Sequence, residues 1–359
     1  MIKIFRSRSN WCFYFHFLIV SILAGFVLCV GLCCCSNSED ITSFTAMNTF
    51  MTVKAYGPRT RTKAANVQVQ KEIERLETIL STTIKVSDVY SINSWGWKHL
   101  ANHNVQPETA FLIEESQKFY KMTGGAFNPA LYPVIREWGF TTGDYKVPED
   151  GKIRELLELT DFSEVKINGS EVYKPDSLQL DFGAIGKGFA GDKAIEILRA
   201  SGIQSALLDF GGNIQVLGCK PDGSDWIVGL KNPWGSEPVA AVKLRDSCMI
   251  TSGGYERFFT GDDGKKYIHI FDGKTGRPVE NEVESVTIIC REGIYGDALS
   301  TALFVMGEKK AVEFWQSCSC SICDFDFIIL TKDRRLNFSA PLKNSISLLF
   351  DFTSVQVVE

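Results

Sequence analysis

The sequence lacks three features that would have indicated other classes of protein. Its formal net charge is −5 over 359 residues, so no overall positive field attracts a nucleic acid. Histidine is scarce, with four in the chain, and no second pair of cysteines or histidines lies at zinc-ribbon spacing from Cys318, Cys320 and Cys323. We therefore interpret these three cysteines as loop thiols, free or paired locally, rather than as metal ligands.

Neither an internal repeat nor a linker rich in proline or serine is present, which argues against a repeat protein and against separable domains. Hydrophobic residues make up 45% of the chain and charged residues 23%, the composition of a globular protein with a sizeable core. We expect residues 36–359 to form one catalytic unit. Any phosphate that it binds must be held by local groups.

The first 35 residues differ from the rest of the chain. Three basic residues precede an acid-free apolar run over residues 11–35, the order that is typical of an export signal. The run is long enough to cross a bilayer as an anchor. Its last residues resemble a bacterial lipoprotein box in which Cys35, or else Cys34 or Cys33, carries the lipid. Both interpretations place the folded part outside the cytoplasm, and the lipoprotein one places it at the periplasmic face of the inner membrane.

Periodicity and turn signals predict the secondary structure. Strands are expected over residues 42–56, 178–182, 205–210, 213–217, 226–230, 239–244, 267–271 and 285–290. Helices are expected from about residue 69 to residue 80 and over residues 107–122, 184–200, 297–306 and 309–316. Because strands and helices mix without a strict βαβ rhythm, we predict an α+β fold with mixed sheets and packed helices.

Residues 180–190 indicate a phosphate-binding turn. There Asp181 closes an expected strand, a glycine turn follows, and Lys187 lies in the first turn of the next helix. Free N–H groups at a helix start favour phosphate, and the lysine adds a full positive charge. The spacing is not that of a Walker A loop. An ion pair within a tight structural turn would explain the same residues.

Asp297 and Thr301 indicate a magnesium site, because residues four apart lie on one face of the expected helix. They offer two hard oxygen ligands to an ion that substrate phosphates usually complete. The alternative is structural: the carboxylate stabilises the helix dipole and the hydroxyl bonds back to the chain.

Polar residues also gather at glycine turns in residues 251–257 and 209–213. Downstream of the first segment, His269 alternates with Ile268 and Ile270, so its ring points away from their face of the strand. A histidine that serves only the structure is the alternative. The second segment is equally well explained by a simple hairpin.

Taken in order, residues 180–190, 209–213, 251–257, 269–278 and 297–306 resemble the ApbE family, the FAD:protein FMN transferases. The resemblance extends from about residue 45 to residue 307, with supporting matches at residues 47–49, 80–82 and 124–129. It implies that FAD is the substrate and that Mg²⁺ is required. It also implies that a threonine hydroxyl of a target flavoprotein attacks the FMN-side phosphorus while AMP leaves.

The resemblance assigns roles to individual residues. It implies Mg²⁺ ligands at Asp297, Thr301 and the main-chain oxygen of Ala184. It implies FAD contacts from Met47, Ala126, Phe127, Asn128, Asp181, Lys187 and Phe271. His269 is the candidate base for the incoming hydroxyl. The implied partners are subunits of membrane electron-transport complexes that carry a Ser/Thr-Gly-Ala-Thr-like acceptor motif.

The chain departs from the family pattern at three places. Thr83 stands where an aromatic ring is usual, residues 127–130 read Phe-Asn-Pro-Ala in place of Phe-Asp-Pro-Thr, and Gly273 replaces a proline. A looser hold on the flavin would favour water as the acceptor, so an FAD pyrophosphatase that releases FMN and AMP is the alternative function. A non-catalytic FAD-binding lipoprotein is a further alternative, which the predicted magnesium pair argues against.

Overall fold

The computed structural model describes residues 37–94, 104–317 and 324–359. The predicted export segment with Cys35, and the cluster of Cys318, Cys320 and Cys323, lie outside these residues. Within the described ranges, no helix combines the length and the apolar character needed to cross a bilayer.

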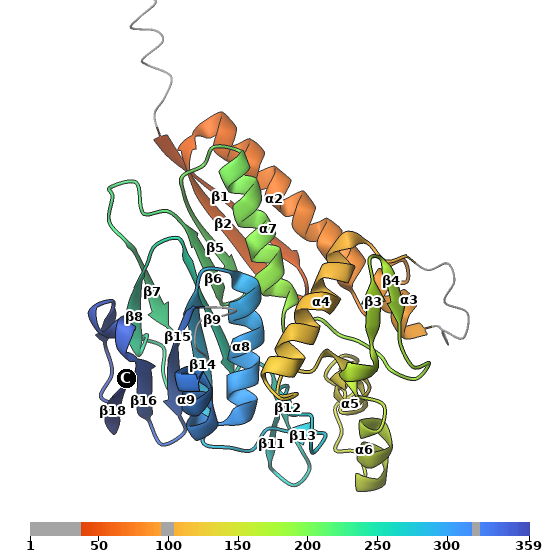
Figure 1. The fold of residues 1–359 in the computed structure, drawn as a ribbon. Helices are drawn as coiled ribbons and strands as arrows, with labels where there is room; N and C mark the ends of the chain where they lie inside the picture. The colour runs from red at the N-terminus through yellow and green to blue at the C-terminus, as the bar shows by residue number, and fades with distance from the viewer. Residues whose placement is uncertain (1–36, 95–103, 318–323) are drawn as a thin grey trace, which may run out of the picture.

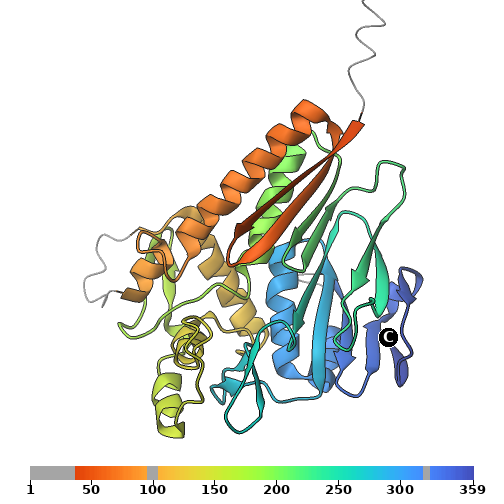
Figure 2. The same cartoon turned by 180° about the vertical axis from the view of Figure 1, so that it is seen from behind.

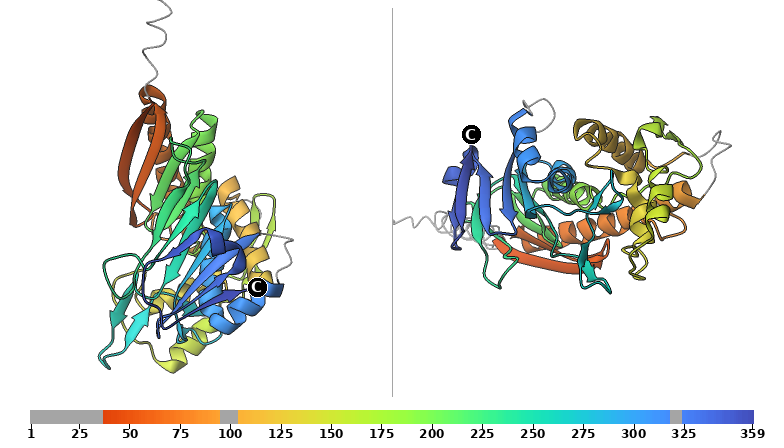
Figure 3. Two further views of the ribbon diagram at one scale, coloured as in Figure 1. Left: turned by 90° about the vertical axis from the view of Figure 1, so that its left-hand side faces the viewer. Right: turned by 90° about the horizontal axis from the view of Figure 1, so that it is seen from below.

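Within the described residues, nine strands form one large sheet in the order β1-β2-β5-β6-β9-β14-β15-β16-β18 (Figure 1). Its strands are β1 Asn37–Ala46, β2 Thr49–Pro58, β5 Ser205–Phe210, β6 Asn213–Leu217, β9 Ser247–Gly253, β14 Val283–Cys290, β15 Phe325–Thr331, β16 Arg335–Ser339 and β18 Ser354–Val358. Neighbouring strands are antiparallel except β16 and β18. The N-terminal hairpin and the C-terminal strands therefore form opposite edges of the sheet, as Figure 3 shows.

Long helices cover one face of this sheet, and Figure 2 shows the sheet from its other side. The helices are α2 Arg59–Leu80, α7 Gly186–Ala200, α8 Gly293–Met306 and α9 Glu308–Ser317. The alternation of side chains along β9 explains this layering, because Cys248 and Ile250 belong to the core cluster of the helices while Met249 belongs to a second cluster. A small sheet of β7 Trp226–Leu230, β8 Ala240–Leu244 and β17 Ile346–Leu348 contributes to the second cluster together with residues of the large sheet.

A lobe of short elements inserts between α2 and α7 and extends beside the end of the sheet (Figure 1). It contains α3 Asp88–Ser94, α4 Pro107–Met122, η2 Pro129–Leu131, α5 Tyr132–Glu137, α6 Asp150–Leu157, η3 Phe162–Glu164, β3 Lys166–Asn168 and β4 Glu171–Tyr173. Two hairpins pack against the lobe: β10 Phe258–Thr260 with β11 Lys266–Ile268, and β12 Phe271–Asp272 with β13 Arg277–Pro278. The remaining short helix, η4 Ala340–Asn344, lies near the C-terminus. Trp138, Phe140, Tyr267 and Phe271 form the apolar centre of the lobe.

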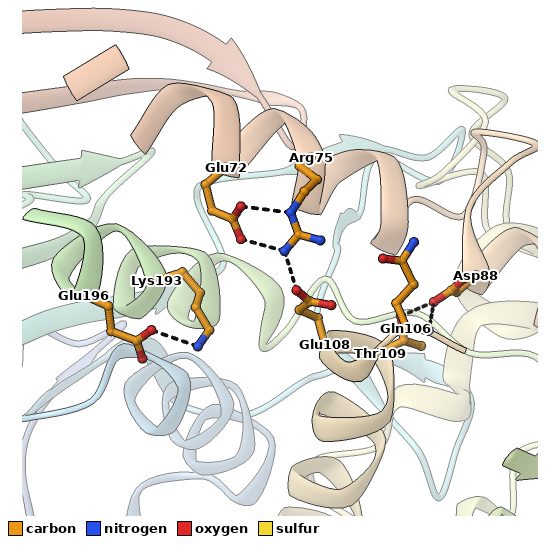
Figure 4. A network of polar contacts seen from close by, with 8 residues as sticks. All are labelled: Glu72, Arg75, Asp88, Gln106, Glu108, Thr109, Lys193 and Glu196. Atoms are coloured by element: carbon orange, nitrogen blue, oxygen red, sulfur yellow. Dashed lines mark hydrogen bonds and ion pairs between the residues drawn. The ribbon is translucent and has the colours of Figure 1, made fainter. Parts of the chain in front are cut away.

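Polar contacts fix α4 against its neighbours (Figure 4). Arg75 on α2 binds Glu72 on its own helix and reaches across to Glu108 at the start of α4. Asp88 on α3 accepts a hydrogen bond from the Thr109 hydroxyl at 2.8 Å. The partly exposed ion pairs contribute little each, and α4 is also held by Leu112, Ile113 and Phe119, which are buried in the core.

The α+β prediction is confirmed, whereas some of the predicted elements are wrong. The expected strand over residues 42–56 is a hairpin, because Met47 and Asn48 adopt φ of 49° and 58° and make a two-residue turn. The expected strand over residues 178–182 is not one: Leu180 pairs through its backbone with the Asn93 side chain, at 2.7 Å in each direction. The expected strand over residues 267–271 is divided between β11 and β12.

Candidate active site

A cavity of about 440 Å³ lies where the turns β1–β2 and β5–β6, the end of β9 and the helices α7 and α8 come together. Every predicted catalytic, FAD-binding and metal-binding residue lines it: Met47, Ala126, Phe127, Asn128, Asp181, Ala184, Lys187, His269, Phe271, Asp297 and Thr301. These residues span most of the described chain, so the fold brings distant segments to one place.

The predicted phosphate-binding turn forms one wall. Asp181 accepts a hydrogen bond from Gly183 N at 2.7 Å, and α7 begins shortly after it with Lys187 in its first turn. Burial raises the pKa of Asp181, against the effects of the Gly183 N–H and of the positive charges of Arg257 and Lys187. The ion pair made by Lys187 is with Asp297, at 3.9 Å, rather than with Asp181.

Asp297 is buried, with 4% of its surface exposed, and its carboxylate is held by other elements. Its Oδ2 accepts from Gly188 N of α7 at 2.9 Å, and its Oδ1 accepts from Asn213 Nδ2 at the start of β6 at 3.1 Å. Helix α8 begins at Gly293, so Asp297 lies in its second turn and faces α7. The carboxylate thus does not cap its own helix, which was the structural alternative.

Gly188 is the third residue of α7, and the first N–H groups of a helix have no carbonyl partner within it. Its N–H donates to Asp297 instead. Ala184 lies just before the helix and lines the cavity. One turn beyond Asp297, the Thr301 hydroxyl lies 3.2 Å from the Ser252 hydroxyl of β9, which also lies 2.9 Å from Ser300 Oγ.

Asp192 fixes the start of the helix that carries Asp297. Its two carboxylate oxygens accept from Gly293 N at 2.6 Å and Ile294 N at 2.8 Å, which satisfies the first donors of α8. Burial raises the pKa of Asp192 to about 7, although both N–H groups favour its charged form. Helices α7 and α8 therefore hold each other reciprocally, since each binds a carboxylate of the other.

The close approach of α7 to α8 predicts a strong effect at Gly188. A methyl group there would overlap the Gly293 carbonyl and lie 2.8 Å from the Asp297 Cβ. Gly188→Ala should therefore cost roughly 1–3 kcal/mol of unfolding free energy and weaken the Mg²⁺ binding predicted for Asp297, as chemical denaturation and metal titration would measure. Gly186→Ala in the same helix turn is the matched control, because no atom lies within 4 Å of the added methyl. Equal behaviour of the two variants would contradict this account.

His269 lies at the cavity with its ring tied to the backbone. Its Nδ1 lies 3.1 Å from the Arg257 carbonyl oxygen, and because that oxygen can only accept, Nδ1 carries the proton and Nε2 is left to accept. Burial, followed by the positive charge of Arg257, lowers the pKa of His269 to about 4. The ring is therefore neutral near pH 7, as a general base must be.

Comparison with known proteins shows the family to which the chain belongs. The model of the ApbE family matches residues 47–322. The chain belongs to the ApbE family. The FAD:protein FMN transferase of Treponema pallidum is 32% identical over 355 residues, covering 90% of this chain and 95% of that protein. That of Klebsiella pneumoniae is 31% identical over 282 residues, covering 77% and 85%.

Solved ApbE structures have the same fold. The ApbE protein of Thermotoga maritima superposes with a TM-score of 0.77 at 29% identity, covering 86% of this chain and 99% of that one. The apo flavinyl transferase ApbE of Pseudomonas stutzeri gives a TM-score of 0.71 at 28% identity, covering 82% and 91%.

The oxygens gathered here suit magnesium. Among the described residues no group of three or more histidines, cysteines, aspartates and glutamates could hold a metal ion. The predicted ligands that line the cavity are instead Asp297, Thr301 and Ala184, which would offer one carboxylate, one hydroxyl and one carbonyl oxygen. Such a sparse set of hard oxygens fits Mg²⁺, which keeps waters and is completed by substrate phosphates.

Several residues that line the cavity were assigned no role from the sequence. Arg257 lines it and donates to the Phe140 carbonyl at 2.7 Å, while Ser252 and Asn213 contact the predicted metal ligands. These residues lie in segments that the sequence singled out without assigning roles. Only the folded contacts could assign them, because Asn213 and Asp297 are 84 positions apart.

The structure also explains one departure from the family pattern. Asn128 donates from Nδ2 to the Thr160 carbonyl at 3.0 Å and accepts at Oδ1 from Ala130 N at 2.9 Å. An aspartate could not make the first of these bonds. Since both ends of the amide are bound to backbone, Asn128 can offer a substrate its main chain more readily than its side chain.

Proposed function

We propose that this chain transfers the FMN part of FAD to a threonine hydroxyl of a target flavoprotein, with Mg²⁺ required and AMP released. The observation that carries the proposal is the convergence of Asp181, Lys187, His269, Asp297 and Thr301 on one cavity. The names of the relatives, FAD:protein FMN transferases, support the same reaction. Residues 36–359 would act as one catalytic unit.

The start of α7 and Lys187 would hold the pyrophosphate. Free N–H groups at the helix start and the lysine charge both favour phosphate oxygens. Mg²⁺ held by Asp297, Thr301 and the Ala184 oxygen would neutralise charge on the pyrophosphate and on the departing AMP. Because Lys187 lies 3.9 Å from Asp297, both positive charges would act on the same group.

His269 would take the proton of the incoming hydroxyl at Nε2. The threonine oxygen forms a bond to the FMN-side phosphorus, the bond from that phosphorus to the bridging oxygen breaks, and AMP leaves with the bridging oxygen. The hydrogen bond from Nδ1 to the Arg257 carbonyl orients the ring for this step. Met47, Phe127 and Phe271 line the cavity and would offer apolar surfaces to the rings of FAD.

The N-terminal sequence supports a location for the reaction. We propose that the chain is exported, anchored through a lipid on Cys35, and active at the periplasmic face of the inner membrane. The apolar run over residues 11–35 is the supporting observation. Subunits of membrane electron-transport complexes with a Ser/Thr-Gly-Ala-Thr-like motif would then be within reach as acceptors.

Product analysis tests transfer against hydrolysis. The chain is incubated with FAD and Mg²⁺, with and without a threonine-bearing acceptor, and AMP, free FMN and protein-bound flavin are measured. Transfer predicts AMP and protein-bound flavin in equal amounts, and only when the acceptor is present. Release of AMP and free FMN with no flavin bound to the acceptor would show a pyrophosphatase instead. Absence of AMP under all conditions would show a protein that only binds FAD.

A further inference from the structure

Two cysteines face each other across the centre of the large sheet. Cys248 of β9 lies directly opposite Cys290 of β14 in the antiparallel register, and their sulfur atoms are 3.3 Å apart. Directly opposite residues have Cα atoms about 4.5 or 5.5 Å apart, depending on the kind of pair. Both spacings lie within the range that a disulfide bridges, about 4.4–6.8 Å.

Both sulfur atoms point to the same side, toward α8. A methyl group on Gly296 would lie 3.0 Å from Ile250 Cδ1, 3.2 Å from Cys248 Sγ and 3.4 Å from Cys290 Sγ, so both sulfurs lie beneath Gly296 beside Ile250. Both cysteines are buried, with 0% and 5% of their surface exposed.

We propose that Cys248 and Cys290 form a disulfide that joins β9 to β14 beneath α8. Gly296 immediately precedes Asp297, so the cross-link supports the turn of α8 that presents the proposed metal ligand. The proposal stands on the geometry of the two sulfurs and does not depend on the proposed transferase reaction.

The chemistry is thiol–disulfide exchange with the disulfide of another protein or of a small thiol. The thiolate of one cysteine attacks this oxidant, forms a mixed disulfide and releases the first thiol of the oxidant. The thiolate of the other cysteine then attacks the mixed disulfide, which closes the Cys248–Cys290 bond and releases the second thiol. Two protons and two electrons leave the protein. Because α8 covers both sulfurs, exchange takes place before α8 packs onto the sheet.

Cysteine alkylation tests the bond. The full chain is isolated without reductant and unfolded in the presence of an alkylating agent, and its peptides are identified by mass spectrometry. We expect the peptides of Cys248 and Cys290 to be joined and to accept the alkyl group only after reduction. The half-buried Cys219 is the internal control and should be alkylated in both samples. Alkylation of both Cys248 and Cys290 without reduction would overturn the proposal.

Thermal unfolding gives a second readout. The closed loop of about 40 residues should raise the melting temperature by roughly 5–10 °C, so reduction should lower it by that amount in the native chain and in the Cys219→Ser variant. The double variant Cys248→Ala/Cys290→Ala should melt at the same temperature with and without reductant. An unchanged melting temperature on reduction of the native chain would contradict a stabilising bond.

Discussion

Replacing Asp297 by asparagine should lower Mg²⁺-dependent release of AMP from FAD on the order of 10³-fold. The variant keeps the volume of the side chain, but it removes the one carboxylate of the proposed ligand set and sets an amide NH₂ against one of its two donors, Gly188 N or Asn213 Nδ2. A metal ion that polarises a phosphoryl group supplies several kcal/mol of transition-state stabilisation, which corresponds to an effect of about this size. Initial rates of AMP release over a Mg²⁺ titration would measure the loss.

Asp326→Asn is the matched control for this variant. Asp326 of β15 is a half-buried aspartate whose pKa is raised, first by burial, and it accepts from the Ser339 hydroxyl at 2.7 Å. It does not line the cavity, so the control should release AMP at nearly the native rate. If Asp297→Asn matched that rate, the metal assignment would be wrong.

Replacing His269 by glutamine should slow transfer of FMN to the acceptor by about 10²–10⁴-fold, the usual contribution of a general base. Glutamine can still donate to the Arg257 carbonyl, but it cannot take a proton. The rate of protein-bound flavin formation at saturating FAD and Mg²⁺ would measure the effect. His269 is the only histidine in the ranges that the structure describes, so no described histidine can replace it.

FAD affinity is the control for the histidine variant. If the ring acts on the hydroxyl proton and not in holding FAD, the dissociation constant followed by flavin fluorescence should change by less than about threefold while transfer falls. A parallel loss of FAD binding and transfer would instead make His269 a binding residue. Transfer at the native rate would exclude it as the base.

Local sequence patterns predicted the fold where they were unambiguous. The strands over residues 205–210 and 213–217 and the helix over residues 107–122 are confirmed at their predicted bounds. The turn at Met47 and Asn48 was missed because it contains no glycine, although both residues adopt positive φ. Apolar and polar side chains alternate over residues 178–182, as they would in a strand. Only the folded chain shows that the backbone N–H and carbonyl of Leu180 are hydrogen-bonded to the Asn93 side chain.

The start of α8 was missed for a related reason. The helix was expected from residue 297 but begins at Gly293, and the group that stabilises its start is Asp192, 101 positions earlier. The members of the site were predicted from motifs, and the structure brings them to one cavity. Their bonding could not be predicted, because it depends on contacts such as those of Asp297 with Gly188 and Asn213.

The mass of the acceptor protein tests the central claim most directly. After incubation of the chain with FAD, Mg²⁺ and a threonine-bearing acceptor, the intact acceptor should be heavier by one FMN group joined through a phosphoester. The same acceptor with valine at that threonine, or with Mg²⁺ chelated, should keep its original mass. An acceptor of unchanged mass in the complete mixture, while AMP is released, would contradict transfer to a protein hydroxyl.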